Sequence, residues 1–358
     1  MRLLFLCNTL YQIIGASAIR NMYPNDEAEI ILTDHSTGSI KIYEEIKRTK
    51  AIFDNAYYLE TKYLYEHDKK LSKYEKYKEI KDIDNYAVLY CFNKKYDMFF
   101  CANSESFSYR IVNYLKRKNR HIIINWFEDG LSAYCYDKCY FPSWKARIKC
   151  KIKEIFGIFN VTCCVNNFYV FQPDKMEWKP KANIQRIEPL SEELARTLST
   201  VFGFEACKDK YEERYIFFED GAIDWNKSKD VELVEKIAEV VGKENILIKI
   251  HPRNPVNRFK TMGYKTNIDT SVPWEIIAAN IDIENKVLIT MYSQSVVTPE
   301  ILLGKNSKVL VLGEVEGYTD TSLTVLYEYI KKNYFLKKAD DYLIPSTIED
   351  ICKMLTSI

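Results

Sequence analysis

The stretch that decides the fold class is residues 2–32, which read RLLFLCNTLYQIIGASAIRNMYPNDEAEIIL. Its apolar start at residues 3–7 predicts a buried strand, and apolar residues then recur at helical spacing through Tyr11, Ile14 and Ile19. A second apolar run at residues 30–32 predicts the next strand. Polar Asn8, Thr9 and Gln12 interrupt the first apolar run too early for a signal sequence. We therefore expect a βαβ opening and a parallel sheet covered by helices.

The same alternation continues through the first half of the chain. Apolar runs predict strands at 86–91, 97–101 and 121–126, and the clearest helical pattern covers 104–118. Periodicity lapses between 172 and 189, where three prolines alternate with charged residues, as is typical of an exposed connection between domains. We therefore predict a first Rossmann-like domain over residues 1–180.

A second α/β unit follows the proline-rich connection. Strands are predicted at 215–218, 246–250, 287–290 and 308–312, and helices at 229–241 and 323–332. This gives a second Rossmann-like domain over 190–340. A Ser346-x-x-Glu349 capping box predicts a terminal helix over 346–358. In two-domain α/β enzymes such a helix often crosses back, so we expect it to join the first domain.

The composition excludes several classes of protein. Lys and Arg number 51 against 50 Asp and Glu, which excludes a basic nucleic-acid coat, and 47% hydrophobic residues exclude general disorder. The ten cysteines form no CxxC pair, so neither a zinc ribbon nor a thioredoxin-type motif is present. A reducing cytoplasm is the expected location. No run approaches the ~20 apolar residues that span a bilayer.

Polar residues directly after predicted strands are the candidate functional residues, because ligands bind at the carboxyl ends of strands in open α/β sheets. The first such group is Glu128, Asp129 and Gly130. A carboxylate here can serve as a general base, but Glu-Asp-Gly is also an ordinary turn sequence. The same residues recur at 219–221, which makes that copy a rival for the catalytic role.

A second group, His251, Pro252 and Arg253, ends the predicted strand 246–250. An imidazole beside a guanidinium can bind a phosphate through charge-assisted hydrogen bonds, whereas a lone histidine is often structural. We interpret this histidine as functional.

Two further groups follow the later strands of the second domain. Ser293 and Ser295 precede a helical segment, where hydroxyls and free amides bind anions or only cap the helix. Glu275 begins a short helix, where a carboxylate accepts ribose hydroxyls or complements the helix dipole.

The order of these motifs resembles the bacterial sialyltransferases of glycosyltransferase family 52 and their relatives, the polysialyltransferases. The resemblance rests on the acidic pair with glycine, then Lys249-x-His251-Pro252, then Glu275, then the serine cluster, and on LFLCNTLYQ at residues 4–12. It implies a GT-B fold, in which two Rossmann-like domains face a central cleft. It also implies a CMP-sialic acid donor held mainly by the second domain, no cofactor and no metal ion.

The resemblance also implies residue roles. Asp129, flanked by Glu128 and Gly130, would be the general base, and His251 would bind the donor phosphate and help CMP to leave. Lys249 would lie by the cytosine through its backbone, with Glu275 by the ribose. The remaining binding candidates are Pro252, Arg253, Ser293 and Ser295, together with Glu128 and Gly130 beside the base. In the family the two hydroxyl residues are usually adjacent, whereas Gln294 separates them here, so which serine contacts phosphate stays open.

The leading hypothesis is an inverting, metal-independent transferase that carries sialic acid to a terminal galactose of a lipooligosaccharide or capsular glycan through an α2,3 linkage. The alternatives are another activated sugar on the same fold, a non-catalytic nucleotide-binding protein, and a membrane-surface scaffold. The family includes dimers, so a homodimer is one option. No nucleic-acid partner is expected.

A basic amphipathic segment lies between residues 144 and 159. Ile148, Ile152, Ile155, Phe156 and Phe159 share one helical face, and Arg147, Lys149 and Lys153 point away from it. Since most amphipathic helices pack inward, we expect this face to be buried. Contact with the cytoplasmic face of the inner membrane is the alternative.

Overall fold

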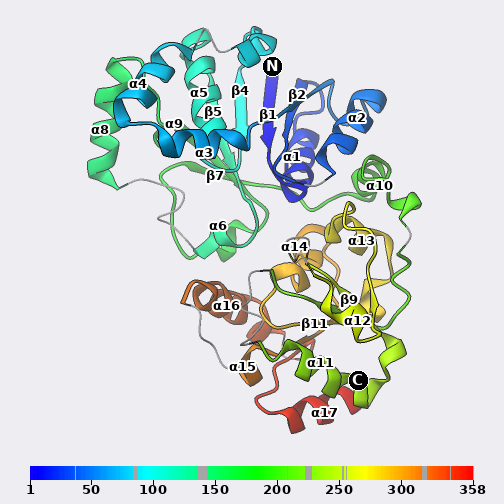
Figure 1. Ribbon diagram of the computed structural model, residues 1–358. Coiled ribbons are helices and arrows are strands. Elements are labelled where there is room, and N and C mark those ends of the chain that lie inside the picture. Colours follow the sequence, from blue (N-terminus) through cyan, green and yellow to red (C-terminus); the bar gives the residue numbers. More distant parts are fainter. Residues whose placement is uncertain are drawn as a thin grey trace. The chain divides into compact units, whose positions relative to one another are not determined.

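The computed structural model describes residues 1–36, 38–83, 87–135, 143–207, 209–221, 228–251, 254, 256–316, 321–338 and 340–357. The chain divides into two compact units, Met1–Val201 and Phe202–Ile358. Each unit has its own parallel sheet with helices packed around it (Figure 1). The predicted α/β class is confirmed.

The N-terminal unit has a seven-stranded sheet in the order β3-β2-β1-β4-β5-β6-β7. All neighbouring strands are parallel, and the chain reverses its direction of winding between β1 and β4. The strands are β1 (Arg2–Cys7), β2 (Glu27–Thr33), β3 (Asn55–Leu59), β4 (Met98–Cys101), β5 (Ile123–Phe127), β6 (Val165–Val170) and β7 (Asn183–Arg186). The β1–β4 boundary is a topological switch point, where ligands bind in such sheets.

Helices fill the connections of this sheet. They are α1 (Leu10–Asn21), α2 (Ser39–Thr49), α3 (Tyr63–Lys70), α4 (Lys73–Lys81), α5 (Ser106–Lys118), α6 (Ser132–Cys135), α8 (Trp144–Ile155), α9 (Val161–Cys164) and α10 (Glu192–Val201). Helix α1 begins where the Thr9 hydroxyl caps the Gln12 amide, and residues 12–19 are buried. Strand side chains such as Leu4 and Phe99 pack against Ile111 of α5 in one core.

The C-terminal unit has a six-stranded sheet in the order β10-β9-β8-β11-β12-β13. Its strands are β8 (Tyr215–Phe218), β9 (Ile246–Lys249), β10 (Lys265–Thr266), β11 (Val287–Thr290), β12 (Lys308–Val311) and β13 (Tyr342–Leu343). Its helices are α11 (Asp230–Val241), α12 (Arg258–Thr261), α13 (Trp274–Asn280), α14 (Thr298–Leu303), α15 (Gly313–Glu316), α16 (Thr321–Asn333) and α17 (Ile348–Thr356). This is the classical Rossmann strand order, with its switch point between β8 and β11.

The division between the units comes later than the proline-rich connection. Strand β7 lies within the stretch interpreted as a connection, and it completes the first sheet as a largely exposed edge strand. Helix α10 then packs on α1 and α2 in the N-terminal unit. An edge strand of four residues has almost no apolar pattern, so its sequence resembles a loop.

Three other predictions differ from the structure. A strand was expected at 86–91, but a short 3₁₀-helix covers Ala87–Phe92. The last helix is capped by Thr347 and Asp350, one residue later than the predicted pair. Helix α17 also stays in the C-terminal unit and packs on α11, because Ile351 and Leu355 enter the core of that unit.

The amphipathic face of α8 is exposed, so the expectation that it packs inward is wrong. Ile148, Ile152, Ile155 and Phe156 are all exposed, and Phe159, beyond the helix, packs against the core. The side of α8 that faces the unit carries Cys150, which is buried. Among the described residues, no helix combines the length and apolar character required to cross a bilayer.

Candidate active site

The candidate base Asp129 lies two residues after β5, opposite the first turn of α1. The Gln12 Nε2 amide donates a hydrogen bond of 2.8 Å to Asp129 Oδ2, and the Thr9 hydroxyl donates to Oδ1 over 3.4 Å. Gly130 follows with a φ of 82°, a left-handed conformation that favours glycine, which confirms the expected tight turn. The turn therefore presents the carboxylate at the carboxyl end of the sheet.

The electrostatics of Asp129 suit a proton acceptor. Its side chain is half-buried, and desolvation raises its pKa above the usual aspartate value, while the two hydrogen bonds work in the opposite direction. A raised pKa makes the carboxylate a stronger base than a solvated aspartate.

Glu128 has a different, structural environment. It is buried and accepts hydrogen bonds from the Tyr11 hydroxyl, the Tyr134 hydroxyl and the Phe171 backbone amide. Burial raises the pKa of Glu128 to about 7, and the neighbouring charge of Asp129 contributes to the rise. Glu128 is only 1% exposed and its hydrogen bonds hold the strand end together, whereas Asp129 is half-buried, so Asp129 is the more accessible carboxylate.

A series of hydrogen bonds connects Asp129 to Glu105, which pairs with His35, two residues after the end of β2. The Asn8 amide donates to Gln12 Oε1 over 2.6 Å, and Asn8 Nδ2 donates to Glu105 Oε2 over 2.8 Å. Glu105 Oε2 lies 3.3 Å from His35 Nε2. Burial raises the pKa of Glu105, and the charge of Asp129 adds to this rise. The hydrogen bonds through Gln12 and Asn8 therefore connect the carboxylates of Asp129 and Glu105 across the β1–β4 switch point.

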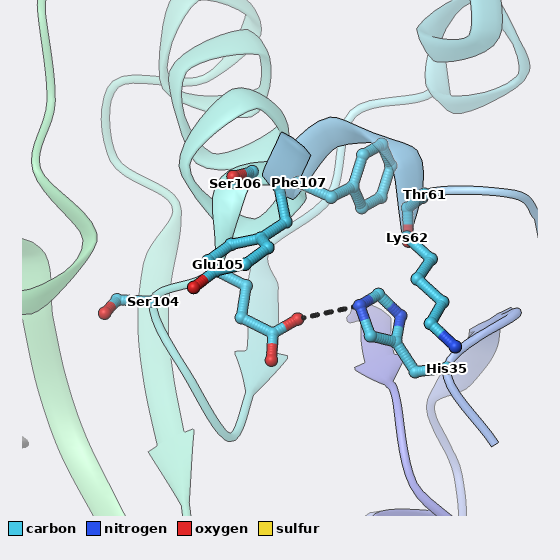
Figure 2. A pocket seen from close by; sticks show the side chains of 8 residues that line it. His35, Thr61, Lys62, Ser104, Glu105, Ser106 and Phe107 are labelled. Atoms are coloured by element: carbon cyan, nitrogen blue, oxygen red, sulfur yellow. Dashed lines mark ion pairs between the residues drawn. The ribbon is translucent and has the colours of Figure 1, made fainter. Parts of the chain in front are cut away.

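A cavity of about 510 Å³ lies beside Glu105, at one end of this series of hydrogen bonds. Figure 2 shows the Glu105 carboxylate directed toward the His35 imidazole inside it. The lining residues are His35, Thr61, Lys62, Tyr65, Ser104, Glu105, Ser106 and Phe107. Two aromatic rings beside hydroxyl, ammonium and carboxylate groups provide an apolar face and several hydrogen-bond partners, the combination that a sugar ring requires.

The second acidic pair, in the C-terminal unit, is bound into the fold. Glu219 is buried, and its Oε1 lies 3.2 Å from Arg258 Nη2, which also pairs with buried Asp230. The backbone amide of Tyr292 donates to Asp220 Oδ2 over 3.2 Å and so connects the ends of β8 and β11. These bonds give the carboxylates of Glu219 and Asp220 structural roles, which favours Asp129 as the candidate general base.

His251 follows β9 and packs against the backbone of Gly221. A Cβ atom built on Gly221 would lie 2.1 Å from both Nδ1 and Cε1 of His251, so only glycine leaves room for the imidazole. The His251 amide donates to Glu219 Oε2 over 3.2 Å, and its carbonyl accepts from the Asn254 amide over 3.0 Å. The ring is thus positioned at the strand end, as predicted. Pro252 and Arg253 lie outside the described residues.

Lys249 and Glu275 influence each other electrostatically. Burial lowers the pKa of Lys249 and raises that of Glu275, and the opposite charge of each partner counteracts both shifts. The Lys249 carbonyl accepts the Glu219 amide over 3.1 Å within the sheet. Glu275 lies in the first turn of α13, next to Trp274, whose Nε1 donates to the Ser295 carbonyl over 2.9 Å. The glutamate and the serine segment are therefore connected through one tryptophan.

The two candidate serines contact each other. The Ser293 hydroxyl donates to Ser295 Oγ over 3.1 Å and accepts the Ser295 amide over 3.3 Å, so it caps a short 3₁₀-helix (Gln294–Val296). The capping alternative is therefore confirmed for Ser293. Both side chains are half-buried, which leaves part of each accessible to a ligand.

Within the described ranges, one group of side chains lies close enough together to hold a metal ion. It consists of His67, Asp68 and Glu79. Arg110, whose side chain is 3% exposed, pairs with both carboxylates, and His67 Nε2 lies 2.6 Å from Glu79 Oε1. The arrangement is that of an ion-pair network.

Sequence reasoning missed His35 and Glu105, and it gave Gln12 no role. Ser104 and Glu105 follow β4 shortly after its end, so the strand-end rule applied to every strand finds them. The contact of Gln12 with Asp129 spans 117 positions and has no local sequence signal.

Residues 213–312 match the family model described as alpha-2,8-polysialyltransferase. The match covers most of the C-terminal sheet and includes Lys249, His251, Glu275, Ser293 and Ser295. The search of curated proteins finds no match.

Solved structures with a similar fold are remote in sequence. The UDP-GlcNAc 2-epimerase of Methanocaldococcus jannaschii is 14% identical, with a TM-score of 0.57 over 99% of this chain and 92% of that one. Arabidopsis thaliana UGT89C1 complexed with UDP is 9% identical, with a TM-score of 0.55 over 99% and 90%. The glycosyltransferase VinC in complex with dTDP is 10% identical, with a TM-score of 0.52 over 99% and 90%. The fold is GT-B, and together with the family match it supports a glycosyltransferase.

Proposed function

We propose that the chain is an inverting glycosyltransferase that moves sialic acid from CMP-sialic acid to a glycan hydroxyl. The observation that carries this proposal is the position of the candidate donor residues. Lys249, His251, Glu275, Ser293 and Ser295 all fall within the segment that resembles the polysialyltransferases.

The proposed reaction is a single displacement. Asp129 removes the proton of the acceptor hydroxyl while its oxygen forms a bond to the anomeric carbon. The bond from that carbon to the phosphate oxygen breaks, and the electron pair leaves with CMP. His251 donates a hydrogen bond to the phosphate and stabilises its growing charge. Attack from the face opposite the leaving group inverts the configuration at the anomeric carbon.

The cavity beside Glu105 is the proposed binding site for the acceptor. It adjoins the hydrogen-bonded chain to Asp129, and its Tyr65 and Phe107 rings can contact a sugar face. A terminal galactose of a lipooligosaccharide or capsular glycan, joined through an α2,3 linkage, stays our first candidate. The family match is named for α2,8 transfer, so a sialylated acceptor is the second.

We further propose that the reaction needs no metal ion or cofactor and takes place in the cytoplasm. The nine cysteines of the described residues are all free thiols, as a reducing compartment would leave them. A homodimer stays a prediction that light scattering tests directly.

The experiment is CMP release from CMP-sialic acid, with and without EDTA, on lactose, N-acetyllactosamine and sialyllactose. Asp129→Asn should lower turnover by about 10²–10⁴-fold, the usual contribution of a general base, and leave CMP affinity unchanged. His251→Gln should weaken both CMP binding and turnover. Matched controls are Asp174→Asn and His121→Gln, which change exposed residues of the same types and should act like the wild type.

Each alternative predicts a different result. If the wild type neither binds CMP nor turns over CMP-sialic acid, the donor assignment is wrong, and other nucleotide sugars are tested next. If CMP binds but no sugar is transferred to any acceptor, the result supports the alternative of a non-catalytic nucleotide-binding protein. If EDTA abolishes activity and added divalent metal restores it, metal independence is wrong.

A further inference from the structure

Helix α8 presents a continuous apolar stripe to solvent. Trp144, Ile148, Ile152 and Phe156 recur every fourth residue, and Ile155 lies beside them. Their exposed fractions range from 51% to 80%. A stripe of five large apolar side chains left in water is unfavourable, so a partner that covers it gains free energy.

The stripe is not needed to hold α8 in place. The helix contacts the unit through its opposite side, where Cys150 is buried and Glu154 Oε1 accepts a hydrogen bond from Cys164. Its C-terminal end is fixed by Ile158, whose amide donates to the Lys153 carbonyl over 3.0 Å and whose side chain enters the core. Substitutions on the outer face therefore leave the packing intact.

The charges around the stripe select the partner. Helix α8 carries Lys145, Arg147, Lys149, Lys151 and Lys153 against the single acid Glu154, although the whole chain is nearly neutral. The four lysines are exposed. An apolar stripe flanked by cations complements an anionic bilayer surface, where lysine stems follow apolar material and their ammonium groups reach lipid phosphates.

Helix α4 extends this surface. It lies beside α8 at the margin of the N-terminal unit (Figure 1), and Lys81 at its end donates to the Phe156 carbonyl. Tyr74 and Tyr77 of α4 are exposed, as are Lys73, Lys76 and Lys78. Tyrosine and lysine together are typical of protein surfaces at the level of lipid headgroups.

We propose that α8 lies flat on an anionic lipid bilayer, with its apolar stripe at the boundary between headgroups and acyl chains. A second copy of the chain fits less well, because a symmetric contact places the lysines of one stripe against those of the other. This inference does not depend on the donor or on the reaction.

The test is co-sedimentation of the full chain with vesicles of equal parts phosphatidylglycerol and phosphatidylcholine. The wild type should pellet with these vesicles, less at high salt, and stay in solution with phosphatidylcholine alone. Ile148→Asn/Ile152→Asn/Ile155→Asn and Lys149→Glu/Lys151→Glu should each bind more than about tenfold more weakly. The controls Ile268→Asn and Lys179→Glu/Lys181→Glu change exposed residues elsewhere and should pellet like the wild type.

Two further readouts separate the outcomes. Circular dichroism and turnover with a water-soluble acceptor should be unchanged in the α8 variants, so a failure of the proposed reaction does not affect the lipid result. The proposal is overturned if the wild type does not pellet with anionic vesicles or if the isoleucine variant still pellets with them. It is also overturned if light scattering shows a wild-type dimer that this variant abolishes without any lipid binding.

Discussion

The side-chain amide of Gln12 connects the backbone of Asn8 to the carboxylate of Asp129. Its Oε1 accepts the Asn8 amide over 2.6 Å, and its Nε2 donates to Asp129 Oδ2 over 2.8 Å. This pairing fixes the orientation of the amide, because the reverse orientation would set two donors against each other. Within the described part of the chain, the Oδ1 atom of Asp129 accepts only the longer bond from Thr9, so we take it as the oxygen that receives the proton.

Replacing Gln12 by glutamate should alter the pH dependence of turnover. The pKa of Asp129 is already raised, and a second carboxylate at Oδ2 raises it further, so the base stays protonated to a higher pH. We expect the acid limb of the kcat profile to move upward and activity to fall more at pH 6 than at pH 8. Gln12→Leu, which removes the hydrogen bond without adding charge, should give a smaller shift. An unchanged limb in Gln12→Glu would show that Asp129 is not the titrating base.

Placing a methyl group on Gly221 should disturb the donor side without unfolding the chain. The new Cβ would lie 2.1 Å from His251 Nδ1 and 2.5 Å from Cγ, so the imidazole must turn away. We expect Gly221→Ala to bind CMP at least about tenfold more weakly, as measured by calorimetry. Gly15→Ala is the matched control, since its Cβ would meet Phe127 at an ordinary 3.5 Å and alanine favours a helix. Equal CMP affinity in both variants would contradict the assigned role of His251.

The elements predicted well are those whose residues are buried on every side. Strands β8 and β11 have the predicted bounds, and β1 begins one residue earlier than predicted, because central parallel strands give unbroken apolar runs. Residues 87–92 also form an apolar run but adopt a 3₁₀-helix, since a short run does not distinguish strand from helix.

The candidate site was predictable only in part. The positions of Asp129 and His251 follow from the strand-end rule, which uses local sequence. The buried role of Glu128 depends on Tyr134 and on the Phe171 amide, and Phe171 lies 43 positions away. The exposed face of α8 was predicted to be buried, because periodicity locates an apolar face without showing what covers it.

Glu128 should make the stability of the N-terminal unit depend on pH near neutrality. Its folded pKa of about 7 exceeds the usual glutamate value, so its contribution is fully present below pH 4.5 and is lost as the pH rises through 7. Relative to Glu128→Gln, which stays neutral, the wild type should lose about 3 kcal/mol of unfolding free energy between pH 5 and pH 8. Urea unfolding at the two pH values measures this difference. A constant difference would show that Glu128 is ionised throughout.

Arg258 should be essential for the stability of the C-terminal unit. Its guanidinium pairs with Glu219 and Asp230, whose side chains are 0% and 1% exposed, so Arg258→Met removes the cation from two buried carboxylates. We expect a loss of about 3–5 kcal/mol, measured by hydrogen exchange of the β8 and β9 amides. Adding Asp230→Asn to Arg258→Met should restore part of this loss, because it removes one of the two buried charges left without a cation.

In contrast, Glu219→Gln should keep turnover within a few-fold of the wild type under conditions where the unit is folded. A loss comparable to that of Asp129→Asn would instead identify Glu219 as the catalytic carboxylate.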